Sequence, residues 1–218
     1  MAVDHLETLG EEIANSITHG LGAILSIAAI ALMVTFASFQ HSDYKVVATA
    51  VYGSTLVLMY LSSTFYHALT HRNAKYVFKI FDHATIFLLI AGTYTPFTLV
   101  NLRGDWGWTL FGIMWGLALV GIVAKCWLVN KGEIISTLIY LFMGWMIVIA
   151  IVPVIHDLSI GGIVWLAIGG TCYTLGTAFF FLENMPFNHM IWHLFVLAGS
   201  ISHFFAVFFY VIPSTLSG

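Results

Sequence analysis

Long apolar stretches separated by short polar segments repeat along the chain from about residue 17 to residue 212. Each stretch is close to the roughly 20 apolar residues that cross a bilayer as an α-helix. Sixteen of the 17 Asp, Glu, Lys and Arg residues lie outside these stretches, and only Asp82 lies within one. The pattern predicts seven membrane-spanning helices, at residues 17–39, 46–67, 80–100, 106–124, 134–155, 160–182 and 187–212.

The connections between the spans are short, which favours a single domain of antiparallel neighbours. We therefore expect an all-α integral membrane protein, a seven-transmembrane helix bundle at residues 17–212. A short cytoplasmic segment at 1–16 is expected before it, and an external tail at 213–218 after it.

Composition excludes several other classes of protein. Apolar residues make up 60% of the chain and charged residues 8%, about a third of the roughly 25% typical of soluble domains. The net charge of −3 provides no basic surface for nucleic acid. The two cysteines, Cys126 and Cys172, are too few for a disulfide scaffold or a thiolate zinc finger.

Lys and Arg are unequally divided between alternate connections. One side has five of them (Arg72, Lys75, Lys79, Lys125 and Lys131), and the other has two (Lys45 and Arg103). By the positive-inside rule the five-charge side is cytoplasmic. With seven spans, the amino terminus is then expected in the cytoplasm and the carboxyl terminus outside.

Polar side chains of four predicted spans gather at the cytoplasmic side of the membrane. They are Asn15 and His19 on the first span, Ser63 and His67 on the second, Asp82 and His83 on the third, and His189 and His193 on the seventh. At 1.5 Å rise per residue, all of them lie within roughly 10 Å of that interface.

This layer contains a candidate zinc site. His189 and His193 are four residues apart and so share one helix face. Joined by His67, they would form the three-nitrogen platform that zinc uses when a fourth position stays open for water. Asp82 would complete the shell directly or hold the zinc-bound water. A closed, purely structural zinc joining the helices is the alternative.

Further roles follow for neighbouring residues. Ser63 is expected to donate to a metal-bound oxygen or to Asp82, and His19 and Asn15 to orient ligands from behind. His203, ten residues beyond His193, is expected to form a hydrogen bond between helices. No function is assigned to the histidines in or near connections, His5, His41, His71 and His156.

Four segments also carry recognisable motifs: EEIANSITHG at 11–20, LSSTFYHAL at 61–69, FDHATIFLLIAGTYTPF at 81–97 and NHMIWHLFVLAGSISHF at 188–204. Through them the chain resembles the bacterial haemolysin III family of the progestin and adipoQ receptor superfamily. That superfamily's motif residues fall on Glu12, Asn15, Thr18, His19, Ser63, His67, Asp82, His189 and His193.

The resemblance implies a Zn²⁺ ion held by His67, His189 and His193, with Asp82 acting through water. It also implies a bacterial cytoplasmic membrane protein related to intramembrane hydrolases that cleave lipid amides such as ceramide. Only 16 residues precede the first span in this sequence, whereas the adiponectin receptors of the same superfamily have a long cytoplasmic region there. No protein hormone is therefore expected as a partner.

Three functions remain open from the sequence. The first is a zinc-dependent lipid amide hydrolase, in which Asp82 orients or deprotonates the nucleophile and Ser63 assists. Its partners would be membrane lipids, including an N-acyl lipid substrate. The second is a regulator or sensor of membrane homeostasis with a structural zinc. The third is a haemolytic oligomeric pore, although the spans carry no continuous polar stripe.

Overall fold

The computed structural model describes residues 7–182 and 184–214. Every regular element in these residues is helical, and seven helices are long and apolar enough to cross a membrane. The predicted seven-helix membrane fold is confirmed. The elements are α1 (Leu9–Ser38), α2 (Asp43–Ala68), α3 (Arg72–Pro96), η1 (Phe97–Asn101), α4 (Asp105–Leu128), α5 (Glu133–Trp145), η2 (Met146–Ala150), α6 (Ile151–Asp157), α7 (Ile160–Phe180), α8 (Asn188–Ala206) and η3 (Val207–Val211).

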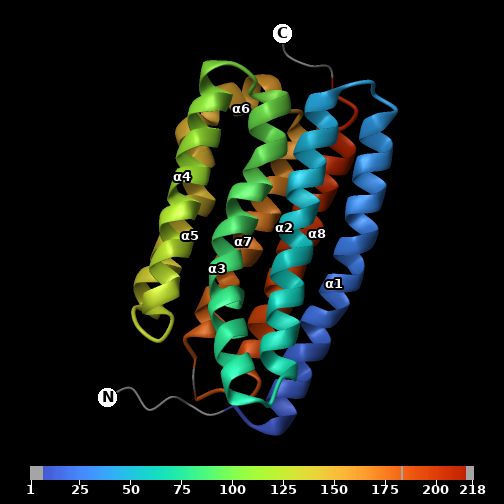
Figure 1. Ribbon diagram of the computed structural model, residues 1–218. Helices are drawn as coiled ribbons and strands as arrows, with labels where there is room; N and C mark the ends of the chain where they lie inside the picture. Colours follow the sequence, from blue (N-terminus) through green and yellow to red (C-terminus); the bar gives the residue numbers. More distant parts are fainter. Residues whose placement is uncertain (1–6, 183, 215–218) are drawn as a thin grey trace.

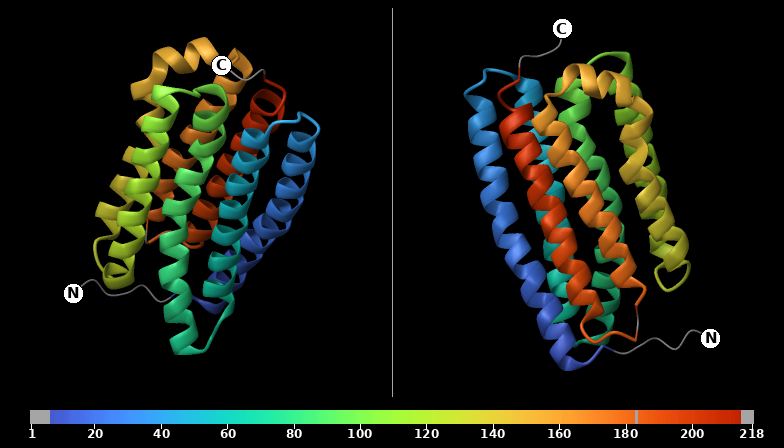
Figure 2. Two further views of the ribbon diagram at one scale, coloured as in Figure 1. Left: turned by 45° about the horizontal axis from the view of Figure 1, so that its top comes forward. Right: turned by 180° about the vertical axis from the view of Figure 1, so that it is seen from behind.

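The helices stand side by side as an elongated bundle (Figure 1). Helices α1, α2, α3 and α4 pack in succession, and α8 lies against both α7 and α1. The first described helix begins, and η3 ends, at opposite ends of the bundle (Figure 1), as an odd number of spans requires. Seen from behind, α8 lies between α1 and α7 (Figure 2).

Helix α1 begins at Leu9, eight residues before the predicted span. The reason is a capping box, in which the Thr8 side chain accepts a hydrogen bond from Glu11 N at 3.3 Å and the Glu11 carboxylate accepts one from Thr8 N at 2.8 Å. These bonds satisfy amide groups that the first helical turn leaves free. As a result, Glu12, Asn15 and His19 lie on one continuous helix.

The fifth span is broken into α5, the 3₁₀ segment η2 and α6. Pro153 explains the break, because its ring would clash with the carbonyl four residues earlier and its nitrogen cannot donate. Tyr94 of α3 repairs it: the hydroxyl lies 2.9 Å from Met143 O, to which it donates, and accepts from Ile147 N at 2.8 Å. A side chain from one span thus replaces backbone bonds missing from another.

Candidate metal centre

Three histidines from two helices meet near one end of the bundle. His67 is on α2, and His189 and His193 are on α8. One ring nitrogen from each lies within 4.8 Å of the others. His67 and His193 are buried, while His189 is partly exposed. The structure therefore brings together the three residues predicted as metal ligands.

Two carboxylates bind the Nδ1 atoms of two of these rings. His67 Nδ1 lies 2.8 Å from the Glu12 carboxylate, and His189 Nδ1 lies 2.9 Å from that of Glu7. Because a carboxylate accepts hydrogen bonds at neutral pH, each Nδ1 carries the hydrogen. In the neutral form of each ring the lone pair is then on Nε2.

The third ring is held by the backbone. His193 Nδ1 lies 3.3 Å from the carbonyl oxygen of Asn15 and 3.2 Å from Thr18 Oγ1. A carbonyl oxygen only accepts, so this Nδ1 also donates and leaves Nε2 as the acceptor. In the described part of the chain, the buried Nε2 of His67 has no hydrogen-bond partner. Three imidazoles whose Nδ1 atoms are bound by carboxylate and carbonyl groups, and whose Nε2 atoms are then the possible ligands, suit the preferences of Zn²⁺.

Glu7 connects the amino-terminal segment to the cluster. Its carboxylate accepts from His189 Nδ1 and from Asn15 Nδ2, the latter at 2.8 Å, and lies 3.4 Å from His67 Nδ1. Burial alone would raise the pKa of Glu7, but the hydrogen bonds from His189 and His67 outweigh it and hold the pKa well below its ordinary value. Glu7 is therefore an anion beside the cluster at neutral pH.

The other predicted site residues lie around this cluster. Asp82 on α3 is 8% exposed and lines a cavity together with His189 and His193. Ser63 is fully buried, and its hydroxyl has no hydrogen bond of ordinary length to any described residue. His67 and Ser63 are both close enough to Asp82 to interact with its carboxyl group. The two polar residues predicted to assist are thus near the histidines.

His19 contacts the cluster through its ring face. Its imidazole stacks on that of His193 with the ring centroids 3.4 Å apart and meets Tyr60 edge-on at 5.0 Å. Its nitrogens form no hydrogen bond with the described residues. His19 can therefore orient His193 by packing, while Asn15 does so through its carbonyl group.

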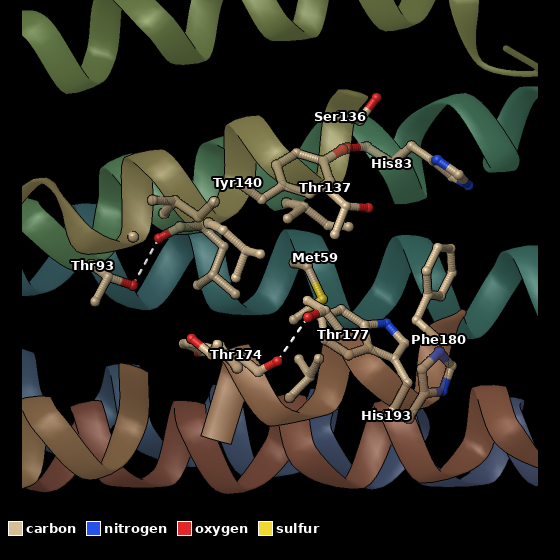
Figure 3. A pocket seen from close by; sticks show the side chains of 18 of the residues that line it. Met59, His83, Thr93, Ser136, Thr137, Tyr140, Thr174, Thr177, Phe180 and His193 are labelled. Carbon is tan, nitrogen blue, oxygen red and sulfur yellow. Dashed lines mark hydrogen bonds between the residues drawn. The ribbon is translucent and has the colours of Figure 1, made fainter. Parts of the chain in front are cut away.

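A cavity of about 140 Å³ extends from the cluster into the bundle between α3, α5, α7 and α8. Its lining is largely apolar, with hydroxyl groups at intervals. Figure 3 shows His83 and His193 at the same end of the cavity and Thr93 toward the other, with Thr137 and Tyr140 of α5 across from Thr174 and Thr177 of α7. The arrangement suits a ligand with a polar head and an apolar chain.

The remaining histidines make local contacts, with one correction. His71 caps α3 by accepting from Ala74 N at 3.4 Å, and His156 Nδ1 lies 2.6 Å from Asp157. The prediction for His203 was wrong.

The predicted hydrogen bond of His203 between helices is replaced by one within α8. Nδ1 of His203 bonds to Gly199 O at 2.8 Å, because that carbonyl lies one turn earlier on the same helix. The contact of His203 with α7 is ring stacking on Tyr173. His41 lies in the α1–α2 connection with a positive φ of 49°, and His5 lies outside the described residues.

The sequence interpretation missed the roles of Glu7 and Glu12. Glu12 was recognised only as a motif position, and Glu7 not at all. The available signal was helical spacing, since Glu12, Asn15 and His19 follow one another at intervals of three and four residues. Glu7 carried no such signal, because it precedes the helix.

Comparison with known proteins adds the family. The family model described as haemolysin-III related matches residues 8–204. Hemolysin-3 of Bacillus cereus is 50% identical over 204 residues, which cover 94% of this chain and 93% of that protein. The Hemolysin-3 homolog of Bacillus subtilis (strain 168) is 46% identical over 205 residues, covering 94% and 96%.

A more distant human relative, the monocyte to macrophage differentiation factor, is 26% identical over 213 residues, which cover 95% of this chain and 87% of that protein. No solved structure matches the chain significantly. The family match spans nearly all of the seven-helix bundle and includes every residue of the histidine cluster, so this membrane protein belongs to the haemolysin III family.

Proposed function

We propose that this protein is a zinc-dependent hydrolase of N-acyl lipids in the bacterial cytoplasmic membrane, with its site in the inner leaflet. The observation that carries the proposal is the orientation of the three histidines. Each Nδ1 is engaged by a partner from α1 or the segment before it, which leaves each Nε2 free of these partners, and one nitrogen of each ring lies within 4.8 Å of the others. This orientation favours a metal site over a cluster of histidines without a metal. The cavity beside the cluster, with Asp82 in its lining, favours hydrolysis over a purely structural zinc.

The chain's own residues supply what amide hydrolysis needs. His67, His189 and His193 would hold the zinc. Bound zinc would polarise an amide carbonyl and lower the pKa of water to about 7. The Asp82 carboxylate would take a proton from the attacking water and deliver it to the leaving amine. Ser63 would hold the Asp82 carboxylate in position, and the apolar cavity would take the acyl chain.

The proposal is tested by separating zinc content from turnover. Purified wild type is expected to contain about one zinc per chain and to release fatty acid from long-chain ceramides or related N-acyl lipids. Asp82→Asn should keep the zinc but lose at least roughly 100-fold in release, because the amide keeps the shape and removes the base. His189→Ala should lose most of the zinc, because one ligand position is then empty.

Asp105→Asn is a suitable control, because Asp105 begins α4 and is exposed. It should match wild type in both measurements. Zinc without release from any N-acyl lipid would favour a regulator with a structural zinc, and equal release by wild type and Asp82→Asn would contradict the proposed base.

The names of two relatives suggest haemolysis as a second candidate function. The surface of the cavity is mainly apolar, so an aqueous pore would have to form between several copies of the chain. Leakage from dye-loaded vesicles that rises with a power of protein concentration above one, and persists in His189→Ala, would support that function over hydrolysis.

A further inference from the structure

A buried lysine lies at the same end of the cavity as the histidine cluster. Lys125 is in the last turn of α4 and is only 3% exposed. Its Nζ lies 3.3 Å from Nδ1 of His83 on α3. An ammonium group only donates, so His83 Nδ1 accepts this bond and the hydrogen of the ring is on Nε2. Both side chains line the cavity that contains Asp82.

Lys125 has no carboxylate partner in the part of the chain that the structure describes. Glu133 and Asp82 line the same cavity, but they interact with the Lys125 ammonium group only by charge attraction at longer range. Lys79 opposes them with a second positive charge. An ammonium removed from water is costly unless an anion or several hydrogen bonds compensate it. One imidazole nitrogen fills a single donor position of the three available.

The position of this pair relative to Asp82 indicates which part of a lipid would reach it. His83 follows Asp82 directly on α3, and the apolar part of the cavity extends the other way, past Leu89 and Thr93. An acyl chain in the apolar part would place its amide near Asp82. The amine side of that amide would then face His83 and Lys125.

We infer that Lys125 and His83 form a subsite for an anionic group, a carboxylate or a phosphate, on the amine side of an N-acyl lipid. The identity of the amide rests on the proposed function. The subsite would make N-acyl amino acids and N-acyl aminophospholipids better ligands than neutral N-acyl lipids. A charge-assisted hydrogen bond to a buried lysine is stronger than one between neutral groups.

The test compares two lipids that share an acyl amide and differ in charge. N-palmitoylglycine carries a carboxylate, and N-palmitoylethanolamine ends in a neutral hydroxyl. Binding of each to the purified, full-length protein in neutral detergent is measured by equilibrium dialysis. Wild type should prefer N-palmitoylglycine by about 10-fold or more, the range of a hydrogen bond to a charged group.

Four variants and a competitor complete the test. Lys125→Gln should lose the preference without weakening binding of N-palmitoylethanolamine, His83→Leu should reduce the preference, and Lys125→Arg should keep it. Lys131→Gln removes a nearby exposed lysine and should behave as wild type. Phosphatidylglycerol, added as a plain anionic membrane lipid, should compete weakly, because it has no amide.

The inference would be overturned by equal binding of the two lipids to wild type, by an unchanged preference in Lys125→Gln, or by strong competition from phosphatidylglycerol. The last result would make Lys125 a general anchor for lipid headgroups. The proposed function is measured separately as fatty acid release. Binding with the expected preference but without release would contradict hydrolysis and leave the subsite intact.

Discussion

At the scale of single residues, each ring of the histidine cluster is held at its Nδ1 atom by a partner outside the cluster. Glu12 is the clearest case, because its two carboxylate oxygens have different partners. One lies 2.8 Å from His67 Nδ1, and the other accepts from Lys75 Nζ at 2.7 Å. Glu12 thereby fixes the tautomer of His67 and is itself held by a lysine of α3.

Glu12→Gln is therefore expected to lower zinc affinity by roughly 10- to 100-fold, the usual cost of losing such a partner. The glutamine side chain keeps the size but no longer favours the Nδ1–H form of His67. Competition with a chelator of known affinity measures the change. Lys75→Gln removes the ion pair with Glu12 but not the contact with His67, so its affinity should stay within about threefold of wild type. An equal loss in both variants would assign the effect to the ion pair.

At the scale of helices, neighbouring spans approach closely where glycine faces a bulky side chain. Gly121 of α4 is buried against the Phe87 ring of α3, and a methyl group there would overlap that ring. Phe87 cannot easily move away, since it is 2% exposed and packs on Tyr140. Gly116 of the same helix is exposed, and a methyl group there would meet no other atom.

The same substitution, glycine to alanine, should therefore have different effects on stability at these two positions of α4. Gly121→Ala should destabilise the bundle by about 1 to 3 kcal/mol through overpacking. Gly116→Ala should be neutral or slightly stabilising, because alanine is the better helix former by about 1 kcal/mol. Unfolding in mixed detergent micelles compares the two variants with wild type. A Gly121→Ala protein as stable as Gly116→Ala would show that the contact between α3 and α4 is loose.

At the scale of the whole molecule, the orientation in the membrane stays a prediction. The beginning of α1, the α2–α3 connection and the α4–α5 connection lie at one end of the bundle (Figure 1). Five of the seven Lys and Arg residues are in those two connections or the helix turns beside them. The histidine cluster is near the same end, since His67 is in the last turn of α2.

The charge distribution predicts that this end faces the cytoplasm. A reporter that is active only in the cytoplasm should give no signal when fused after Gly218, and one that is active only outside should give a signal there. Fusions in the α4–α5 connection, for example after Lys131, provide the opposite control. A cytoplasmic signal from the carboxyl-terminal fusion would contradict the predicted orientation.

The sequence by itself determined the number of spans, the gathering of the polar residues near one end of the bundle and the pairing of His189 with His193. These properties depend only on the length of apolar runs and on helical spacing, which can be read along one dimension. The same reasoning located His67 and Asp82 near the end of the bundle where His189 and His193 lie. It could not show which way they face.

Only the tertiary structure decided which side chains meet across helices. A membrane helix is apolar on most of its surface, so the sequence pattern does not specify the rotation of the helix about its axis as it does in a soluble bundle. The contacts of Glu7 with His189, of Glu12 with His67 and of Lys125 with His83 all depend on that rotation. So does the repair of the fifth span by Tyr94, because the hydroxyl and the broken backbone lie about 50 residues apart in the chain.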